Sequence, residues 1–425
     1  MTTVRLVPGP LRGRLRAPPS KSYTHRFVLA AHLSGRPSRL RRPLESDDTA
    51  RTAEAVRALG SRVRTGPGTW SVAPDPARER RRSCTVDCGE SGTTLRLLAP
   101  AAALLDRSVR FVGRGRLPSR PMEPLFRTLA ALGATIERGN RGAALPFGIR
   151  GPIHGGRVDL PVSESSQFTS ALLMSLPRVT PDSFVRPIGT PVSEPYVLAT
   201  LAVMRRQGVE VARTARGFRI PGGQRYRAVD AEVPGDASSA AYLWAGAAIS
   251  GGRTTVTGIP TRWPQADLAV LELLGRYGAE VSRRGGSVTV EGSRRRPFRV
   301  GLDDAPDLYP LAGVLAASAS GRSELVGAAH VVAKESDRRA ETIRLVHAMG
   351  GRAVATPAGL AVEGTARPRR LDLRGVHDHR LVMSAAVAAL AADGPSRVAD
   401  GACVGKSYPG FFDDFARLGV EVGRP

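Results

Sequence analysis

The feature that most constrains the fold is an internal repeat. The end of an amphipathic helix, a glycine and a short β-type stretch recur six times, with neighbouring copies about 70 residues apart. The glycine suits the left-handed residue that ends a helix, and six such copies at near-equal spacing are not a chance pattern. We therefore predict an α/β protein built from six copies of one unit, three in each of two domains. The repeat glycines are Gly60, Gly133, Gly208, Gly278, Gly350 and Gly419.

Length and composition agree with a two-domain protein. The 425 residues are 42% hydrophobic, which is enough for two full cores. The three cysteines form no disulfide framework, and the Cys84 and Cys88 pair lacks a second ligand pair for zinc. The N-terminal residues have no signal-peptide core, and no apolar run reaches the length of a membrane helix. We expect a cytoplasmic protein without a metal site.

The net charge of +24 favours anionic partners. The arginines are scattered, however, and only 5% of the residues are aromatic side chains that could stack on bases. We therefore predict small anionic molecules as partners, and neither nucleic acid nor a membrane.

Lysine is rare in this chain, since Lys+Arg total 62 and only Lys21, Lys334 and Lys406 are lysines. A compact lysine ammonium group can donate to several oxygens and can shift its pKa, which an arginine guanidinium does less readily. Lys21 lies in the stretch Pro18–Arg26, where two prolines lead into an apolar helical run. Together with Ser22 and Arg26 it would form an anion site at a helix N-terminus.

Other segments repeat this arrangement of polar groups before an apolar helix. They predict further anion-binding helix starts, and Asp307 and Glu335 add carboxyl groups for proton transfer. The segments are Cys88–Arg96 with Gly92, the Arg120-Pro121 pair, Ser163–Phe168, Ser193–Tyr196, Gly235–Ala240, Ala305–Pro310, Lys334–Arg338, His377–Arg380 and Gly405–Pro409.

Taken together and in this order, these motifs resemble the EPSP synthase family of enolpyruvyl transferases. The resemblance runs nearly end to end. It is carried by Pro-Ser-Lys-Ser with Arg26, Gly-Thr with Arg96, Arg120-Pro121, Ser165-Ser166-Gln167, Gly-Asp-Ala-Ser-Ser at 235–239, Lys-Glu-Ser-Asp-Arg at 334–338, Asp-His-Arg at 378–380 and Lys406.

The resemblance implies a two-domain fold of six βαβαββ repeats, three per domain, arranged as an inside-out α/β barrel. It implies a discontinuous domain of residues 1–20 and 236–425 and an inserted domain of residues 21–235, with the active site in the cleft between them. Domain closure on the substrates would exclude water. It further implies a monomer that acts without a cofactor.

The implied reaction transfers the enolpyruvyl group of phosphoenolpyruvate to the 5-hydroxyl of shikimate 3-phosphate, by addition and elimination, and releases phosphate. Asp307 would take the hydroxyl proton, Glu335 would protonate the methylene carbon, and Lys21 would touch both substrates. Shikimate 3-phosphate would be held by Lys21, Ser22, Arg26, Ser165, Ser166, Gln167, Ser193, Asp307 and Lys334. Phosphoenolpyruvate would be held by Lys21, Gly92, Arg120, Gln167, Arg338, Arg380 and Lys406. Glyphosate would compete at the latter site, where Gly92 leaves room.

Three residues depart from the family pattern, namely Glu90, His330 and Val332. They leave open a related enolpyruvyl transferase with another acceptor, such as UDP-N-acetylglucosamine or a specialised-pathway alcohol. The loop at 113–121 has no cysteine, which argues against the first acceptor. The net charge motivates an RNA-binding or RNA-processing alternative, and a non-catalytic binder of small anions is a third. The intact Asp307 and Glu335 argue against a non-catalytic binder.

Overall fold

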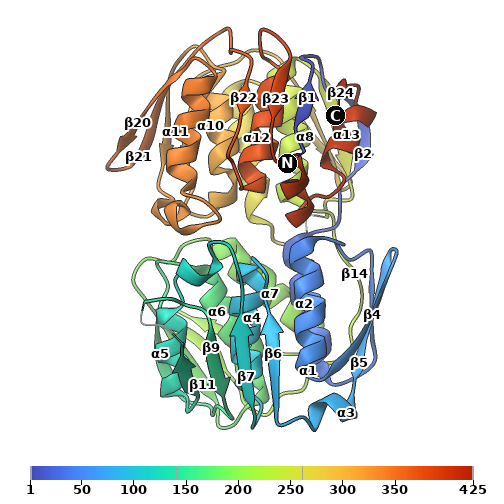
Figure 1. Cartoon of the computed structure of the whole chain (residues 1–425), viewed down its shortest axis with the longest axis vertical. Helices are drawn as coiled ribbons and strands as arrows, with labels where there is room; N and C mark the ends of the chain where they lie inside the picture. The colour runs from blue at the N-terminus through green and yellow to red at the C-terminus, as the bar shows by residue number, and fades with distance from the viewer. Residues whose placement is uncertain (1, 140–141, 261, 424–425) are drawn as a thin grey trace. The chain divides into compact units, whose positions relative to one another are not determined.

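The computed structural model describes residues 2–139, 142–260 and 262–423 (Figure 1). The chain divides into two compact units: an inserted unit, Pro19–Val233, and a discontinuous unit, Met1–Pro18 with Pro234–Pro425. The sequence predicts the corresponding boundaries after residues 20 and 235. The two units are described separately below.

The inserted unit contains three four-stranded sheets with the orders β14-β3-β5-β4, β6-β7-β9-β8 and β10-β11-β13-β12. The first repeat has α1 (Lys21–Ser34), β3 (Ser38–Arg41), α2 (Asp47–Ala58), β4 (Ser61–Gly66), β5 (Thr69–Pro74) and the short α3 (Pro76–Glu79). Its first strand is β14 (Asp230–Glu232), which comes much later in the chain. The second repeat has β6 (Ser83–Asp87), α4 (Gly92–Ala102), β7 (Ser108–Val112), η1 (Leu117–Ser119), α5 (Glu123–Ala131), β8 (Thr135–Arg138) and β9 (Phe147–Arg150). The third has β10 (Arg157–Pro161), α6 (Ser166–Ser175), η2 (Leu176–Arg178), β11 (Ser183–Ile188), α7 (Glu194–Arg206), β12 (Ala212–Thr214) and β13 (Gly217–Ile220).

The discontinuous unit has the same plan, with the sheet orders β16-β17-β15-β2, β18-β19-β21-β20 and β22-β23-β1-β24. Its first repeat has β2 (Arg12–Arg16), α8 (Ala237–Ser250), β15 (Arg253–Thr257), η3 (Ala266–Ala269), α9 (Val270–Tyr277), β16 (Glu280–Arg284) and β17 (Ser287–Glu291). The second has β18 (Arg299–Gly301), η4 (Pro306–Leu308), α10 (Tyr309–Ala317), β19 (Gly321–Val326), η5 (Ala329–Ala333), α11 (Arg338–Ala348), β20 (Arg352–Thr356) and β21 (Gly359–Gly364). The third has β22 (Asp372–Leu373), α12 (His379–Ala389), β23 (Ser396–Val398), η6 (Gly401–Lys406), α13 (Phe411–Arg417), β24 (Val422–Gly423) and β1 (Val4–Leu6).

Every sheet therefore comes from a βαβαββ unit, which confirms the predicted fold. The first and second strands pair in parallel, and the fourth strand inserts antiparallel between the second and the third, as in β6-β7-β9-β8. Three repeats are completed by strands far away in sequence, and one of these strands is β1, which inserts antiparallel between β23 and β24. The late strand β14 pairs in parallel with β3, and the N-terminal strand β2 pairs in parallel with β15. These two exchanges occur where the chain passes between the units.

The six repeat glycines occupy one structural position. Each follows the second helix of its repeat and precedes the third strand, and each has a positive φ, from 76° at Gly208 to 118° at Gly60. A side chain at such a φ is strained, so glycine ends the helix at the lowest conformational cost. The spacing that marks the repeat in the sequence is the spacing of these helix ends.

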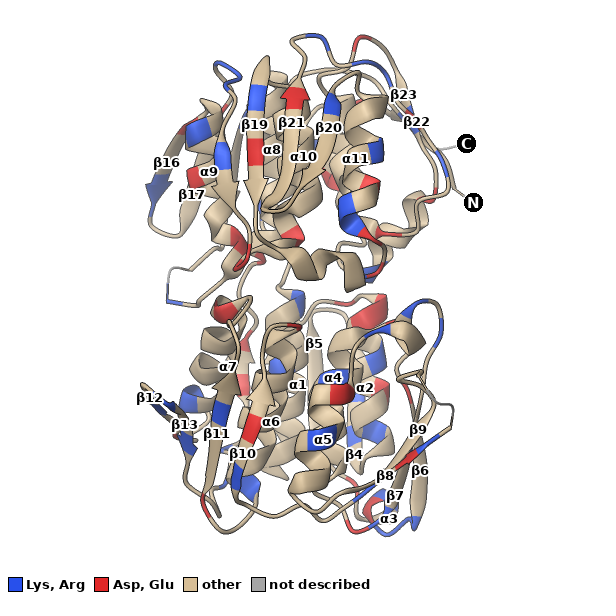
Figure 2. Cartoon of the chain, turned by 90° about the vertical axis from the view of Figure 1, so that its left-hand side faces the viewer, with Lys and Arg blue, Asp and Glu red and all other residues tan. Residues whose placement is uncertain are grey.

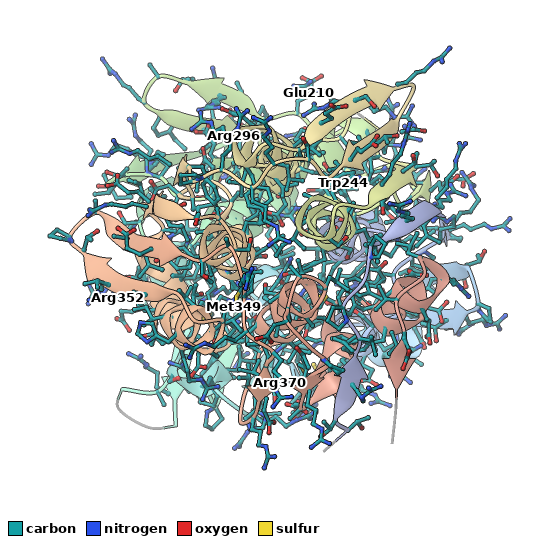
Figure 3. All side chains as sticks on the ribbon, turned by 90° about the horizontal axis from the view of Figure 1, so that it is seen from above. Glu210, Trp244, Arg296, Met349, Arg352 and Arg370 are labelled. Atoms are coloured by element: carbon teal, nitrogen blue, oxygen red, sulfur yellow. The ribbon has the colours of Figure 1, made fainter. Side chains whose placement is uncertain are left out.

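The first helix of each repeat lies inside its unit and the sheets lie outside. In the discontinuous unit α8, α10 and α12 contact one another, and almost all their residues are buried. In the inserted unit α4 packs against both α1 and α6. Figure 3 shows Trp244 of α8 within this core, whereas Arg352 and Arg370 lie at its periphery. Buried helices inside the sheets match the predicted inside-out barrel.

Lysine and arginine are spread over the helices, strands and loops of both units (Figure 2). Many arginines form exposed ion pairs, such as Arg276 with Glu272 and Arg127 with Glu123. Within the described ranges, no helix combines the length and apolar character that crossing a membrane requires.

Two repeat glycines give a matched test of this fold. An added Cβ would lie 2.2 Å from the Arg294 carbonyl oxygen at Gly278, but would meet no atom of the described residues within 4 Å at Gly419. We expect Gly419→Ala to cost about 1 kcal/mol through backbone strain alone. Gly278→Ala should cost at least about 2 kcal/mol more, because the Arg294 backbone must also move. Urea denaturation of both variants measures the difference, and equal losses would contradict the packing described here.

Candidate active site

Arg338 is the centre of a polar cluster in the discontinuous unit. It begins α11, and its side chain is only 1% exposed. Its guanidinium contacts Asp307 at 2.7 Å, Glu335 at 2.8 Å and Asp378 at 2.9 Å. Burial opposes its charge, but the three carboxylates outweigh burial and raise the pKa of Arg338 above its ordinary value. One arginine thus joins carboxylates from three helix starts.

Asp307 is shared between two arginines. One carboxylate oxygen accepts a hydrogen bond from Arg338, and the other accepts one from Arg380 at 3.0 Å. Burial favours the neutral carboxyl, but Arg380, Arg338 and Lys334 outweigh it and hold the pKa of Asp307 well below its usual range. In this arrangement Asp307 is ionised.

Behind Arg380 lies a further carboxyl group that the sequence reasoning did not identify. Asp267, in η3, is 1% exposed, accepts a hydrogen bond from Ser238 and lies 3.9 Å from the Arg380 Nη1. Its Oδ1 atom has no hydrogen-bond partner among the residues that the structure describes. Burial, opposed by Arg380 and reinforced by the Asp307 charge, raises the pKa of Asp267 to about 6. Arg380 therefore lies between an ionised carboxylate and one that is readily protonated.

The remaining predicted cations of this unit lie close by. Lys334 precedes Glu335 and contributes to the field at Asp307. Lys406 ends η6, which contacts α12. His330, in η5, has its pKa lowered to about 4 by burial and by the charge of Lys334, so it is neutral at pH 7. This departure from the family pattern therefore adds no positive charge at that pH.

The hydroxyl-rich cluster predicted in the inserted unit forms between α4 and α6. Ser165 occupies the N-cap of α6, and its Oγ accepts from the Gln167 backbone N–H. Arg96 of α4 donates to the Gln167 Oε1 at 3.0 Å and to the Ser165 Oγ at 3.3 Å. The Gln167 Nε2 donates to Thr93 at 3.0 Å. Arg96 and Thr93 were absent from the predicted site residues, although both belong to the Gly-Thr and Arg96 motif that carries the resemblance.

Arg120 lies directly over the start of α4. A Cβ added to Gly92 would lie 2.6 Å from the Arg120 Nη1 and 2.8 Å from its Cζ. The loop at 113–121 thus presents an arginine fork at a helix N-terminus whose first residue has no side chain. Glu90, the acidic departure, is exposed and lies beside Gly115 of that loop.

Lys21 begins α1 and forms a 3.0 Å ion pair with Asp48 of α2. A capping box between Ser46 and Thr49 is present, but the ion pair was missed. Asp48 lies within this capping segment, and nothing in the sequence pairs it with Lys21. Only the three-dimensional arrangement reveals the ion pair.

Arg26 and Ser193 lie where α1 meets the start of α7. Arg26 is buried and donates to Thr200, to the Ser22 carbonyl and to the Tyr196 carbonyl. Burial lowers the pKa of Arg26 to about 10, which leaves it charged at neutral pH. Ser193, the N-cap of α7, is buried and has a φ of 56°.

A pH measurement tests the Asp267 assignment. Because its folded-state pKa is raised, its contribution to stability is fully present below about pH 4 and is lost as the pH rises through about 6. The stability of Asp267→Asn relative to the parent protein should therefore increase between these limits, by on the order of 3 kcal/mol. Urea denaturation from pH 4 to pH 7 measures this difference. The exposed control Glu272→Gln should show no such trend, and a pH-independent difference for Asp267→Asn would contradict the assignment.

Comparison with known proteins agrees with this arrangement. Residues 7–415 match the family model described as EPSP synthase (3-phosphoshikimate 1-carboxyvinyltransferase). A 3-phosphoshikimate 1-carboxyvinyltransferase of Methanocorpusculum labreanum is 39% identical over 419 residues, or 97% of each chain. The Halobacterium salinarum protein of the same name is 40% identical over 425 residues, or 98% of each.

Solved structures share the fold. The chain superposes on an EPSP synthase from Acinetobacter baumannii with a TM-score of 0.81 and 25% identity, covering 100% of both chains. The enolpyruvyl transferase NikO from Streptomyces tendae gives a TM-score of 0.78 at 19% identity, which is a likeness of fold alone. The near-complete match to the family model, together with the full-length relatives, places this chain in the EPSP synthase (3-phosphoshikimate 1-carboxyvinyltransferase) family.

Proposed function

We propose that this protein transfers the enolpyruvyl group of phosphoenolpyruvate to the 5-hydroxyl of shikimate 3-phosphate. The observation that carries the proposal is the pairing of Asp307 and Glu335 on one buried guanidinium, that of Arg338. Two carboxyl groups held in this way can serve as a base and an acid within one reaction. The enzyme class and family follow from the comparisons above.

The chemistry requires one proton donor and one proton acceptor. Glu335, in its protonated form, gives a proton to the methylene carbon of phosphoenolpyruvate. Asp307 takes the proton of the 5-hydroxyl as that oxygen bonds to the neighbouring carbon. Loss of phosphate and of one proton from the new methyl group then restores the double bond. The overall exchange needs no change of oxidation state.

The low pKa of Asp307 would make it a poor base if the cluster stayed as it is. Both arginines that depress it, Arg338 and Arg380, are proposed ligands of the anionic phosphoenolpyruvate. When a carboxylate or phosphate of the substrate shares these guanidinium groups, their effect on Asp307 weakens and its pKa rises. Substrate binding would thus activate the base.

The inserted unit supplies a different set of groups. Its helix starts present the hydroxyls of Ser165 and Ser166 and the amide of Gln167, which suit a phosphate. Arg120 over Gly92 suits a second anion. Since the proton donor and acceptor belong to the other unit, we propose that both sets act on one bound substrate pair. We further propose a cytoplasmic monomer.

Phosphate release tests the proposed base. Asp307→Ala should lower release that depends on both substrates by at least about 10²-fold, because the hydroxyl proton loses its acceptor. The exposed neighbour Asp304 provides the control Asp304→Ala, which should stay within about twofold of the parent rate. Unchanged release in Asp307→Ala would refute its role as the base. Release with another hydroxyl acceptor but none with shikimate 3-phosphate would refute the acceptor and keep the reaction class.

Gly92→Ala tests the Arg120 contact. The new Cβ would displace the end of a flexible side chain, so the protein should still fold while its anion site changes. We expect the KM for phosphoenolpyruvate to rise about tenfold or more, through loss of a charge-assisted hydrogen bond. Inhibition by glyphosate should weaken in parallel. Gly301→Ala, where the added Cβ meets open space, is the control. An unchanged KM would show that Arg120 does not bind phosphoenolpyruvate.

A further inference from the structure

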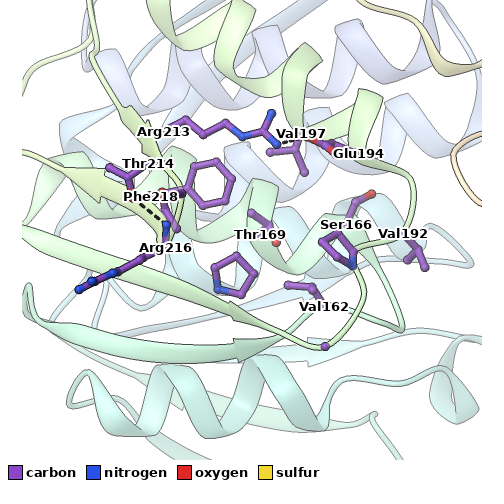
Figure 4. Close-up of a pocket in the computed structure, with 15 residues that line it drawn as sticks. Val162, Ser166, Thr169, Val192, Glu194, Val197, Arg213, Thr214, Arg216 and Phe218 are labelled. Atoms are coloured by element: carbon purple, nitrogen blue, oxygen red, sulfur yellow. Dashed lines mark hydrogen bonds and ion pairs between the residues drawn. The ribbon is translucent and has the colours of Figure 1, made fainter.

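A pocket of about 280 Å³ lies in the third repeat of the inserted unit (Figure 4). It is lined by α6, by the start of α7, by the connection at 189–193 and by the hairpin β12–β13. Of the residues proposed to hold the substrates, only Ser166 lines it. Its volume is just below the ~300–1,000 Å³ of typical small-molecule sites.

The pocket lies where the third repeat of the inserted unit differs from the other five repeats. Each has a connection from its second strand to its second helix, and in five of them an apolar side chain of that connection is buried. Those side chains are Leu44, Leu117, Trp263, Val331 and Val404. In the third repeat the connection is Gly189–Ser193, and its Val192 is only half-buried. Val192 lies against the pocket instead, so the connection leaves space beside it that is open to a ligand.

The lining defines the chemistry of that ligand. Val192, Val197 and Phe218 form apolar walls, and the ring of Phe218 faces the pocket in Figure 4. The rim carries two arginines, Arg213 and Arg216, against one acid, Glu194. Arg213 and Glu194 form an exposed ion pair, and such pairs exchange partners at little cost. An excess of one positive charge beside apolar walls suits a small carboxylate.

We propose that this pocket binds a small carboxylate with an apolar body, such as an aromatic acid, and that its occupation strengthens shikimate 3-phosphate binding. The link is Ser193, because the residues on both sides of it, Val192 and Glu194, line the pocket. Ser193 has a left-handed backbone conformation, which persists only where its surroundings hold it. A ligand packed against its neighbours supports that conformation. This second half of the proposal rests on the proposed function, whereas ligand binding itself does not.

Benzoate is the probe for the binding half, titrated into the whole chain without substrates and followed by NMR. We expect saturable binding with a Kd on the order of 1 mM. Uncharged benzamide should bind at least fivefold more weakly. Absence of saturable benzoate binding would overturn the proposal.

Two variants place the probe in the pocket. Arg216→Gln should weaken benzoate binding at least fivefold by removing a rim charge, and Val192→Trp should abolish it by filling the space. The matched controls Arg219→Gln and Leu198→Trp change exposed residues of the neighbouring strand β13 and helix α7 that do not line the pocket, and they should bind benzoate normally. If Val192→Trp fails to fold, as judged by circular dichroism, Arg216→Gln decides alone. Unchanged binding in Arg216→Gln would then contradict the assignment.

Competition separates this pocket from the substrate site. Shikimate 3-phosphate should not displace benzoate but should bind at least twofold more tightly in its presence, and by linkage benzoate should bind more tightly with the substrate. Displacement of benzoate would mean that the pocket belongs to the substrate site and would overturn the proposal. Benzoate binding with no shikimate 3-phosphate binding at all would refute the proposed function and leave the carboxylate site standing.

Discussion

The buried guanidinium of Arg338 is the interaction on which the chemistry of this protein depends. It stabilises three carboxylates that would otherwise repel one another, those of Asp307, Glu335 and Asp378. Removing such a group leaves uncompensated buried charge, which is costly. The same guanidinium is proposed to receive the anionic substrate. The three carboxylates therefore stabilise and position the Arg338 guanidinium before a substrate binds.

The repeat explains how one arginine reaches carboxylates from distant parts of the chain. The first helices of the three repeats lie side by side within the discontinuous unit, so residues at their starts are neighbours. Asp307 lies just before α10 and Asp378 caps α12. In the inserted unit the same plan joins Gln167 of α6 to Thr93 of α4. Short polar motifs at the starts of equivalent helices are thus brought together by the packing of those helices.

The sequence predicted the fold well because its signal is periodic. Each repeat glycine marks a helix end, and all six have the positive φ that only glycine adopts cheaply. Asp307, Glu335 and Arg338 were predicted as site residues in separate motifs and roles, and the structure joins them in one cluster. Asp267 and Asp48 were not found, since each matters through one partner far away in sequence, Arg380 or Lys21. The pocket beside Val192 could not be predicted either, because no sequence pattern distinguishes a half-buried valine from a buried one.

The most direct test of the proposed roles of Glu335 and Asp307 is whether hydrogen from the solvent enters the product during turnover. In deuterium oxide, with phosphoenolpyruvate and shikimate 3-phosphate both present, Glu335 would deliver deuterium to the methylene carbon, which briefly becomes a methyl group. We expect deuterium in the methylene group of the product, detected by NMR, and we expect both this label and turnover to be lost in Glu335→Gln. Product formed at the normal rate without deuterium would contradict addition followed by elimination, and with it the proposed pairing of acid and base on Arg338.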